Sequence, residues 1–114
     1  MLIQSKDSIF LDELFNNLEN EHIAVKKETQ HSKGAMSATG LTTALALGNL
    51  TLKAIDTLLK ILNFFQDQQD YYIHIKLKDG REMKLNDISK EKQLEEFNAI
   101  KNNINILSIE KGQN

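Results

Sequence analysis

The spacing of apolar residues predicts a helix near the start of the chain, flanked by two short strands. Between residues 8 and 21, apolar side chains recur every three or four positions and share one helical face: Leu11, Leu14, Phe15 and Leu18. This period is typical of an amphipathic helix. After it, Ile23 and Val25 alternate with other residues, which favours a half-buried strand. The short apolar stretch at residues 2–5 fits another strand.

The middle of the chain predicts one long helix. Over residues 41–65, apolar side chains form a wide helical stripe, at positions 44, 47, 50, 54, 55, 58, 61, 62 and 65. Gly48 lies inside this segment and costs about 1 kcal/mol relative to alanine, so we expect a kink or a close neighbour there. Residues 30–40 are small and polar with two glycines, which predicts a flexible loop before the helix.

Strict alternation predicts a β-hairpin over residues 71–86. The apolar face of its first strand consists of Tyr71, Ile73, Ile75 and Leu77. We expect Asp79 and Gly80 to form a tight primed turn, because both residue types tolerate positive φ angles. Ser89 is a suitable N-cap for a last helix. Apolar residues between positions 104 and 109 predict a closing strand.

These elements predict a single α+β domain over residues 1–114, in the order (β)αβ-α-ββαβ with a long central apolar helix. Each strand and helix has one apolar face to cover, so we expect a two-layer sandwich. It would consist of a small mixed or antiparallel sheet with helices on one face. The length of 114 residues suits one domain, and 40% hydrophobic residues with 26% charged ones exclude a disordered chain.

The charge balance points to no class of partner. The chain has 14 basic and 16 acidic side chains, and a net charge of -2. Such a charge implies neither nucleic acid nor an acidic membrane surface as partner, so we expect no nucleic-acid binding. There is no cysteine. The first residues mix charges with apolar side chains, unlike a secretory signal, so we expect a cytoplasmic location.

The residues available for catalysis do not converge. His22, His31 and His74 fall in three different elements, with no metal-binding spacing around them. We interpret His74 as an ordinary cross-strand neighbour of Lys84 or Glu82. There is no nucleophile elbow and no phosphate loop with a following lysine. We therefore expect no enzyme, no metal site and no cofactor.

The predicted helix over residues 41–65 is long and apolar enough to raise the question of a membrane span. Lys53, Asp56 and Lys60 would each cost a few kcal/mol at mid-membrane, so burial in the domain or in a partner is the better interpretation. The alternative is a membrane-associated component, in which this helix swings out about the loop of residues 30–40 and lies in a lipid interface. A small-ligand pocket between helix and sheet is a third possibility.

Small residues on the predicted helix suggest an interface. Gly40, Ala44 and Gly48 fall at intervals of four, which lets another helix approach closely. Excess apolar surface on a small domain usually marks a contact with another protein. The predicted interaction residues are Gly40, Leu41, Ala44, Leu45, Gly48, Leu52 and Leu59. We therefore expect a non-enzymatic adaptor that docks a protein partner or associates with itself.

The order of features also resembles a known family. A helix and strand, a Gly-containing loop, a long Leu/Ala-rich helix, and then a hairpin with Asp79, Gly80 and Arg81 at its turn are expected to follow one another over residues 9–100. This order is similar to that of the effector-associated constant component proteins of bacterial conflict systems. The resemblance implies a small adaptor in an antiviral defence system, with an effector such as a peptidase or nucleotidase as its partner. The chain departs from the family in lacking tryptophan.

Overall fold

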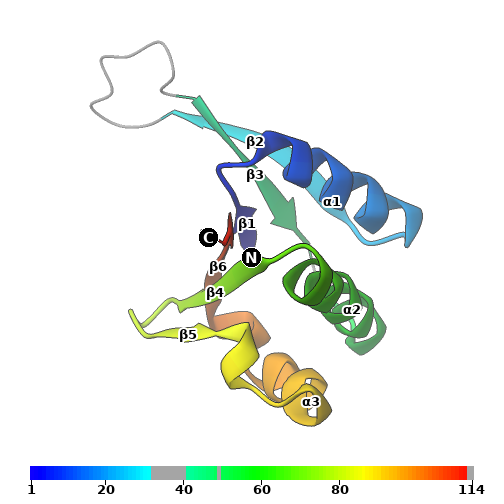
Figure 1. The fold of residues 1–114 in the computed structure, drawn as a ribbon, viewed down its shortest axis with the longest axis vertical. Coiled ribbons are helices and arrows are strands. Elements are labelled where there is room, and N and C mark those ends of the chain that lie inside the picture. Colours follow the sequence, from blue (N-terminus) through cyan, green and yellow to red (C-terminus); the bar gives the residue numbers. More distant parts are fainter. Residues whose placement is uncertain (32–40, 49, 113–114) are drawn as a thin grey trace.

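The computed structural model describes residues 1–31, 41–48 and 50–112, without the side chains of residues 29–31 and 41–43. The described residues form three α-helices and a six-stranded mixed sheet (Figure 1). The elements are β1 (Leu2–Gln4), α1 (Ser8–Asn20), β2 (Val25–His31), β3 (Leu41–Leu47), α2 (Leu52–Gln68), β4 (Tyr71–Leu77), β5 (Glu82–Lys84), α3 (Lys90–Ile100) and β6 (Ile104–Lys111). Short 3-10 turns occupy Leu85–Asp87 and Lys101–Asn103. The predicted α+β class is confirmed, but the sheet is larger than we expected.

The first and last strands pair at the centre of the sheet. The strand order is β2-β3-β1-β6-β4-β5. β1 and β6 run parallel, with Ile3 opposite Leu107, and the other neighbouring strands run antiparallel. The sheet therefore consists of a β2-β3 hairpin and a β4-β5 hairpin, which β1 and β6 join.

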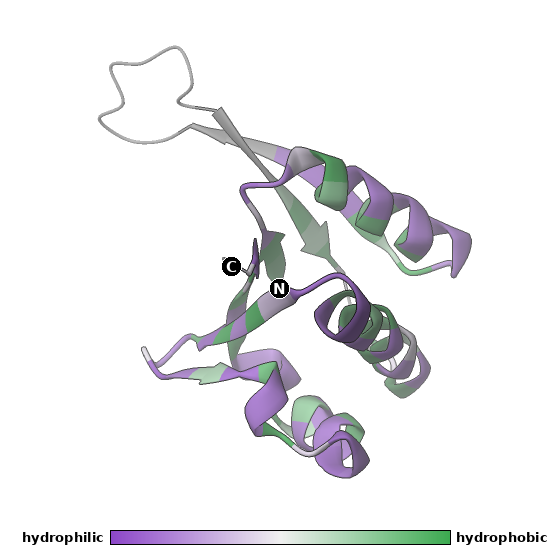
Figure 2. Cartoon of the chain, viewed as in Figure 1, coloured by the Kyte–Doolittle hydropathy of each residue, from purple (hydrophilic) through white to green (hydrophobic). Residues whose placement is uncertain are grey.

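The hydrophobic core lies between the sheet and the helices. All three of these helices cover the same face of the sheet (Figure 1). The surfaces of α1 and α3 that point away from the sheet are mostly hydrophilic (Figure 2). Fully buried side chains come from every layer: Ile3, Phe10, Leu11, Leu14, Leu18, Leu45, Ile55, Leu58, Leu62, Ile73, Ile75 and Phe97. The apolar faces predicted for the first helix and for β4 both form part of this core.

The predicted single helix over residues 41–65 is wrong. Residues 41–47 form β3, which pairs on one side with β2 and on the other with β1. Its side chains alternate between the two faces of the sheet: Leu45 and Leu47 face the helices, whereas Ala44 and Ala46 lie on the opposite face. α2 begins only after Thr51, whose hydroxyl Oγ1 accepts a hydrogen bond from the Ala54 N–H at 3.1 Å. The segment is therefore a seven-residue strand followed by a 17-residue helix.

The predicted hairpin is confirmed, but its turn differs from the prediction. Gly80 has a φ of 95°, whereas Asp79 does not take a positive φ. The Gly80 N–H donates to the Leu77 carbonyl at 3.1 Å, and the Leu77 N–H donates to the Arg81 carbonyl at 2.8 Å. This is a longer hairpin loop that needs one glycine in the left-handed region. The Asp79 carboxylate accepts from the Arg81 N–H and side chain, which holds the pKa of Asp79 below its ordinary value.

Asp7 connects the start of α1 to β4. One carboxylate oxygen caps the helix by accepting from the Phe10 N–H at 3.1 Å, and the other accepts from the Tyr71 hydroxyl at 2.8 Å. The Tyr71 ring is buried and stacks on Phe10, with centroids 4.5 Å apart. Phe65 of α2 meets both rings edge to face. The two hydrogen bonds of Asp7 and the contacts among the three rings thus hold α1, α2 and β4 together.

Gln93 makes a second buried polar connection, between α2 and α3. Its side chain is 3% exposed. Its amide nitrogen lies 3.3 Å from both the Leu85 and the Ile88 carbonyl oxygens, and its amide oxygen accepts from Asn63 Nδ2 at 2.7 Å. The Leu85 carbonyl also accepts from the Ile88 N–H at 3.1 Å, so the carbonyl that depends on Gln93 for a donor is that of Ile88.

Candidate interaction surface

The face of the sheet opposite the helices is the candidate functional site. No helix or strand of the described chain lies over it (Figure 1). The strand register arranges its side chains in two rows that cross the strands from β2 to β5. One row is Lys26, Ala46, Leu2, Ile106, Lys76 and Glu82, and the other is Glu28, Ala44, Gln4, Ser108, His74 and Lys84. We call these side chains the open face.

The open face has a small, apolar centre and charged edges. At the centre, Leu2, Ala46 and Ile106 are half-buried, and Ala44 is only 1% exposed. Four exposed charged side chains lie at the two edges, namely Lys26 and Glu28 on β2, and Glu82 and Lys84 on β5. Tyr72 precedes His74 by two residues on β4 and lies on the same face of the sheet. It is 48% exposed and extends the surface beyond the second row. An apolar patch with a polar rim is the usual anatomy of a protein-binding surface.

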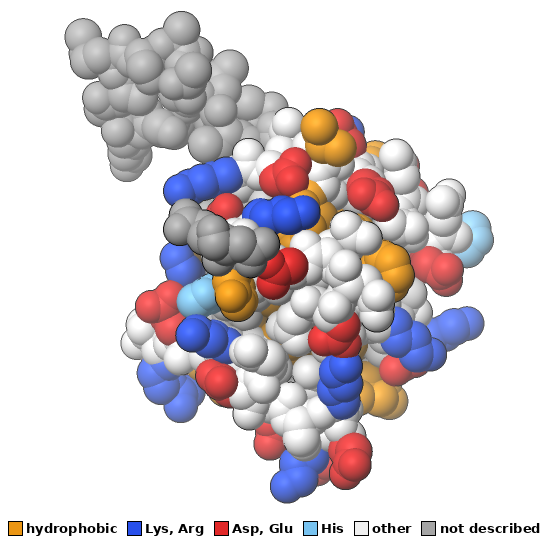
Figure 3. Space-filling model, viewed as in Figure 1, with side chains coloured by type: hydrophobic (Ala, Val, Ile, Leu, Met, Phe, Trp, Pro, Cys, Tyr) orange, Lys and Arg blue, Asp and Glu red, His pale blue; other side chains and the backbone are white. Residues whose placement is uncertain are grey.

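The charges of the open face are mixed in sign. His74 lies opposite Lys84, one of its two predicted neighbours, and Lys76 lies opposite Glu82 in the β4-β5 register. Acidic and basic side chains are also interspersed over the side of the molecule that Figure 3 shows. Among the described residues, no group of three His, Cys, Asp or Glu side chains could hold a metal ion. The chemistry of this face suits recognition of a protein surface of mixed charge.

The predicted interaction residues do not gather on one surface. Ala44 lies on the open face, but Leu45 is in the core on the other side of β3. Gly48 follows β3, and its N–H donates to the Ala24 carbonyl at 3.1 Å. Leu41 is the first residue of β3, and its side chain lies outside the described residues, as does Gly40. The predicted seam of small residues required a helix, which this segment does not form.

The two predicted residues of α2 have opposite environments. Leu59 is buried in the core at 4% exposure, whereas Leu52 is 54% exposed on the first turn of the helix. Phe64, also 54% exposed, lines a groove of about 340 Å³ between α1 and α2. Lys60 and Glu13 at its walls make it only partly apolar.

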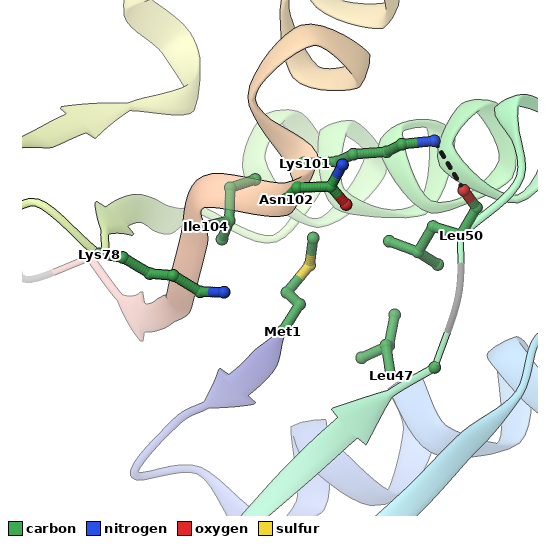
Figure 4. Close-up of a pocket in the computed structure, with 8 residues that line it drawn as sticks. Met1, Leu47, Leu50, Lys78, Lys101, Asn102 and Ile104 are labelled. Carbon is green, nitrogen blue, oxygen red and sulfur yellow. Dashed lines mark hydrogen bonds between the residues drawn. The ribbon is translucent and has the colours of Figure 1, made fainter.

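A basic pocket of about 460 Å³ lies at the end of the sheet where β3 ends and β6 begins (Figure 4). Two lysines line it, Lys78 after β4 and Lys101 after α3, together with the Asn102 amide. The Lys101 ammonium already donates to the Leu50 carbonyl at 3.1 Å. The remaining described lining residues are Met1, Leu47, Gly48, Leu50 and Ile104. The pocket is a basic depression beside the open face, with one of its two lysines committed to the backbone.

The open face was missed from the sequence. The alternation of leucine with alanine over residues 44–47 was the available indication, because it matches a strand with one small-residue face. The same residues also fit the helical stripe of residues 41–65. Only the pairing of β3 with β1 and β2 shows that Ala44 and Ala46 share a surface with Leu2 and Ile106.

Comparison with known proteins adds no family to this description. No family model, no curated protein and no solved structure matches the chain. The resemblance to effector-associated constant component proteins therefore stays a prediction. In the described part of the chain, no helix has the length and apolar character needed to cross a membrane.

Proposed function

We propose that the chain is a non-enzymatic protein–protein interaction module and that its partner binds to the open face. The observation that carries this proposal is that, in the described part of the chain, all three helices cover the same face of the six-stranded sheet. A sheet with one face packed on helices and one face free commonly carries polar residues along its free face. Here the centre of the first row is instead apolar, with Ala46, Leu2 and Ile106 as neighbours, while the second row has Ala44 beside the polar Gln4 and Ser108.

The rigidity of the face supports the same function. Each central strand of the open face is paired on both sides, and its alternate side chains are anchored in the core. Ile3, Leu45 and Leu107 are all fully buried on the helix side. A partner therefore meets a surface whose backbone is already ordered, which limits the entropy lost on binding.

The nature of the partner follows from the resemblance. Within this proposal, the chain is an adaptor in a bacterial conflict system, and its partner is an effector such as a peptidase or nucleotidase. The membrane-associated alternative depended on one continuous helix over residues 41–65. Residues 41–47 form an interior strand of the sheet, paired on both sides, which favours the adaptor over that alternative.

The test compares the proteins captured from the host by the tagged chain with those captured by variants of the open face. Ile106→Glu places a charge at the centre of the face, and Ile106→Thr keeps a β-branched residue while removing apolar surface. Lys92→Glu on α3 is the control, because Lys92 is exposed on the helix layer. We expect a defined set of proteins that both Ile106 variants lose and the control retains. Equal capture by all four folded proteins would contradict the proposal.

A further inference from the structure

We infer that the open face binds a second copy of the chain, packed face to face about a two-fold axis that runs parallel to the central strands. This inference deepens the proposed function and rests on it. The evidence is the distribution of charge and side-chain size along the two rows of the open face. That distribution is complementary to itself under this one symmetry operation.

The operation exchanges the two edges of the sheet. An axis between β1 and β6, parallel to both, leaves each row facing the same row of the second copy. It places β2 opposite β5, β3 opposite β4, and β1 opposite β6. Two sheets that pack in this way keep their strands within about 30° of each other, at a separation of about 10 Å. Long charged side chains at the edges can cover the offset that such a twist produces.

The edge charges meet charges of opposite sign. Lys26 lies opposite Glu82 of the second copy, and Glu28 lies opposite Lys84 of the second copy. The two-fold axis generates each pair twice, so all four edge charges find a partner. All four side chains are exposed in the single chain. They are therefore available for contacts between copies.

The middle of each row is complementary in size and polarity. Leu2 lies opposite Ile106 of the second copy, which brings apolar side chains together. Ala46, which is half-buried, lies opposite Lys76, so a small residue faces a large one; Ala44, opposite His74, is already only 1% exposed in the single chain. Alternating small and large side chains across facing positions lets two layers interdigitate.

The other in-plane axis gives a poorer match. A two-fold axis perpendicular to the strands would place the first row of one copy against the second row of the other. Leu2 would then face Gln4, Ile106 would face Ser108, and Lys76 would face His74. The edge charges would still alternate in sign, but the apolar residues would face polar ones. The parallel axis is therefore the one that the side chains favour.

The size of the open face indicates a weak dimer. It offers about a dozen side chains, whereas a standard stable interface uses about 20–30 residues on each side. We therefore expect a dissociation constant in the micromolar range and a dependence on salt, because the edge pairs are screened by ions. Analytical ultracentrifugation over micromolar to millimolar concentrations covers this range.

The test uses charge reversal at one facing pair. A dimer of Lys26→Glu chains has two acidic residues facing each other at both 26–82 contacts. A dimer of Glu82→Lys chains has two basic residues facing each other at both contacts. We expect either variant alone to raise the dissociation constant by about tenfold or more. An equal mixture of the two is expected to associate like the unmodified chain, because Glu at 26 of one copy then faces Lys at 82 of the other. Lys92→Glu and Glu91→Lys on α3 are the matched controls, and neither is expected to change association.

Restored association in the mixture would support the parallel axis. Under the perpendicular axis the mixed dimer would still contain one acid–acid contact and one base–base contact. A chain that stays monomeric to millimolar concentration would overturn the inference, as would reversal variants that associate normally. If the chain is monomeric but the Ile106 variants capture fewer host proteins than the unmodified chain, the interaction function stands and only the self-association fails. If they lose nothing, both proposals fail.

Discussion

Asp7 caps α1 and also accepts the Tyr71 hydroxyl, so its replacement tests how the first helix is attached to the sheet. We expect Asp7→Ala to lower the free energy of unfolding by about 2–3 kcal/mol. About 1 kcal/mol comes from the lost N-cap. A further 1–2 kcal/mol, roughly, comes from the Tyr71 hydroxyl, which is left in a mostly buried position without its acceptor. For a domain of this size, that corresponds to a fall in melting temperature of roughly 8–15 °C.

The pH dependence of stability gives an independent measure of the same contact. The pKa of Asp7 is lowered from 3.8, first by the Phe10 N–H and then by the Tyr71 hydroxyl. The folded state therefore favours the ionised carboxylate, and this stabilisation is present above the ordinary pKa and lost as pH falls through the lowered one. Burial and the Asp7 carboxylate raise the pKa of Tyr71 to about 12. Its contribution is present below pH 10 and is lost as pH rises toward 12.

A double-mutant cycle measures the contact itself. Asp7→Asn keeps a capping oxygen but removes the charge, and Tyr71→Phe removes only the hydroxyl. Urea unfolding of the two single variants and the double variant at neutral pH is expected to give a coupling energy of about 1 kcal/mol. Asp7→Asn is also expected to lose less stability than the unmodified chain on acidification. A coupling energy below about 0.3 kcal/mol would refute the hydrogen bond as a structural link.

Three further changes test local features of the fold by urea unfolding. Gly80→Val forces a branched side chain into a φ of 95° and is expected to cost about 1–3 kcal/mol, with Gly80→Asn costing less; equal stability of both would contradict the turn. Thr51→Ala removes the cap of α2 and is expected to cost about 1 kcal/mol, which Thr51→Ser should largely restore; no loss would place the helix start elsewhere. Gln93→Leu removes the hydrogen bonds to the Asn63 amide and the Ile88 carbonyl and is expected to cost about 1–3 kcal/mol, while Lys92→Leu changes stability by less than about 0.5 kcal/mol; similar values for the two would argue against the buried network.

Elements governed by local pattern were predictable from the sequence. β4 alternates strictly, and α1 has one apolar stripe with a polar remainder, so the period alone identifies each. The closing strand and the last helix were predicted in the same way. For His74 the predicted neighbours were Lys84 or Glu82, and it lies opposite Lys84.

The strand over residues 41–47 could not be distinguished from a helix by local pattern. Leucine and alanine favour helices, and an apolar run of this length fits either structure. What decides is pairing with distant residues, because Leu45 lies beside both Ile3 and Lys27. The open face was hidden for the same reason. Its rows exist only once six strands from the whole chain are set in register.

The parallel pairing of β1 with β6 at the centre of the sheet also governs how the chain reaches its folded state. Ile3 and Leu107 are about a hundred residues apart in sequence, yet they are neighbours in the sheet. Closing so large a loop is entropically costly, and proteins rich in such contacts fold in milliseconds to seconds, not microseconds. During synthesis, the β2-β3 hairpin can form early, but its junction with β4 and β5 must wait for β6. Until then, β1 lacks its parallel neighbour, and newly made chains expose an unpaired strand edge through which they can pair with one another.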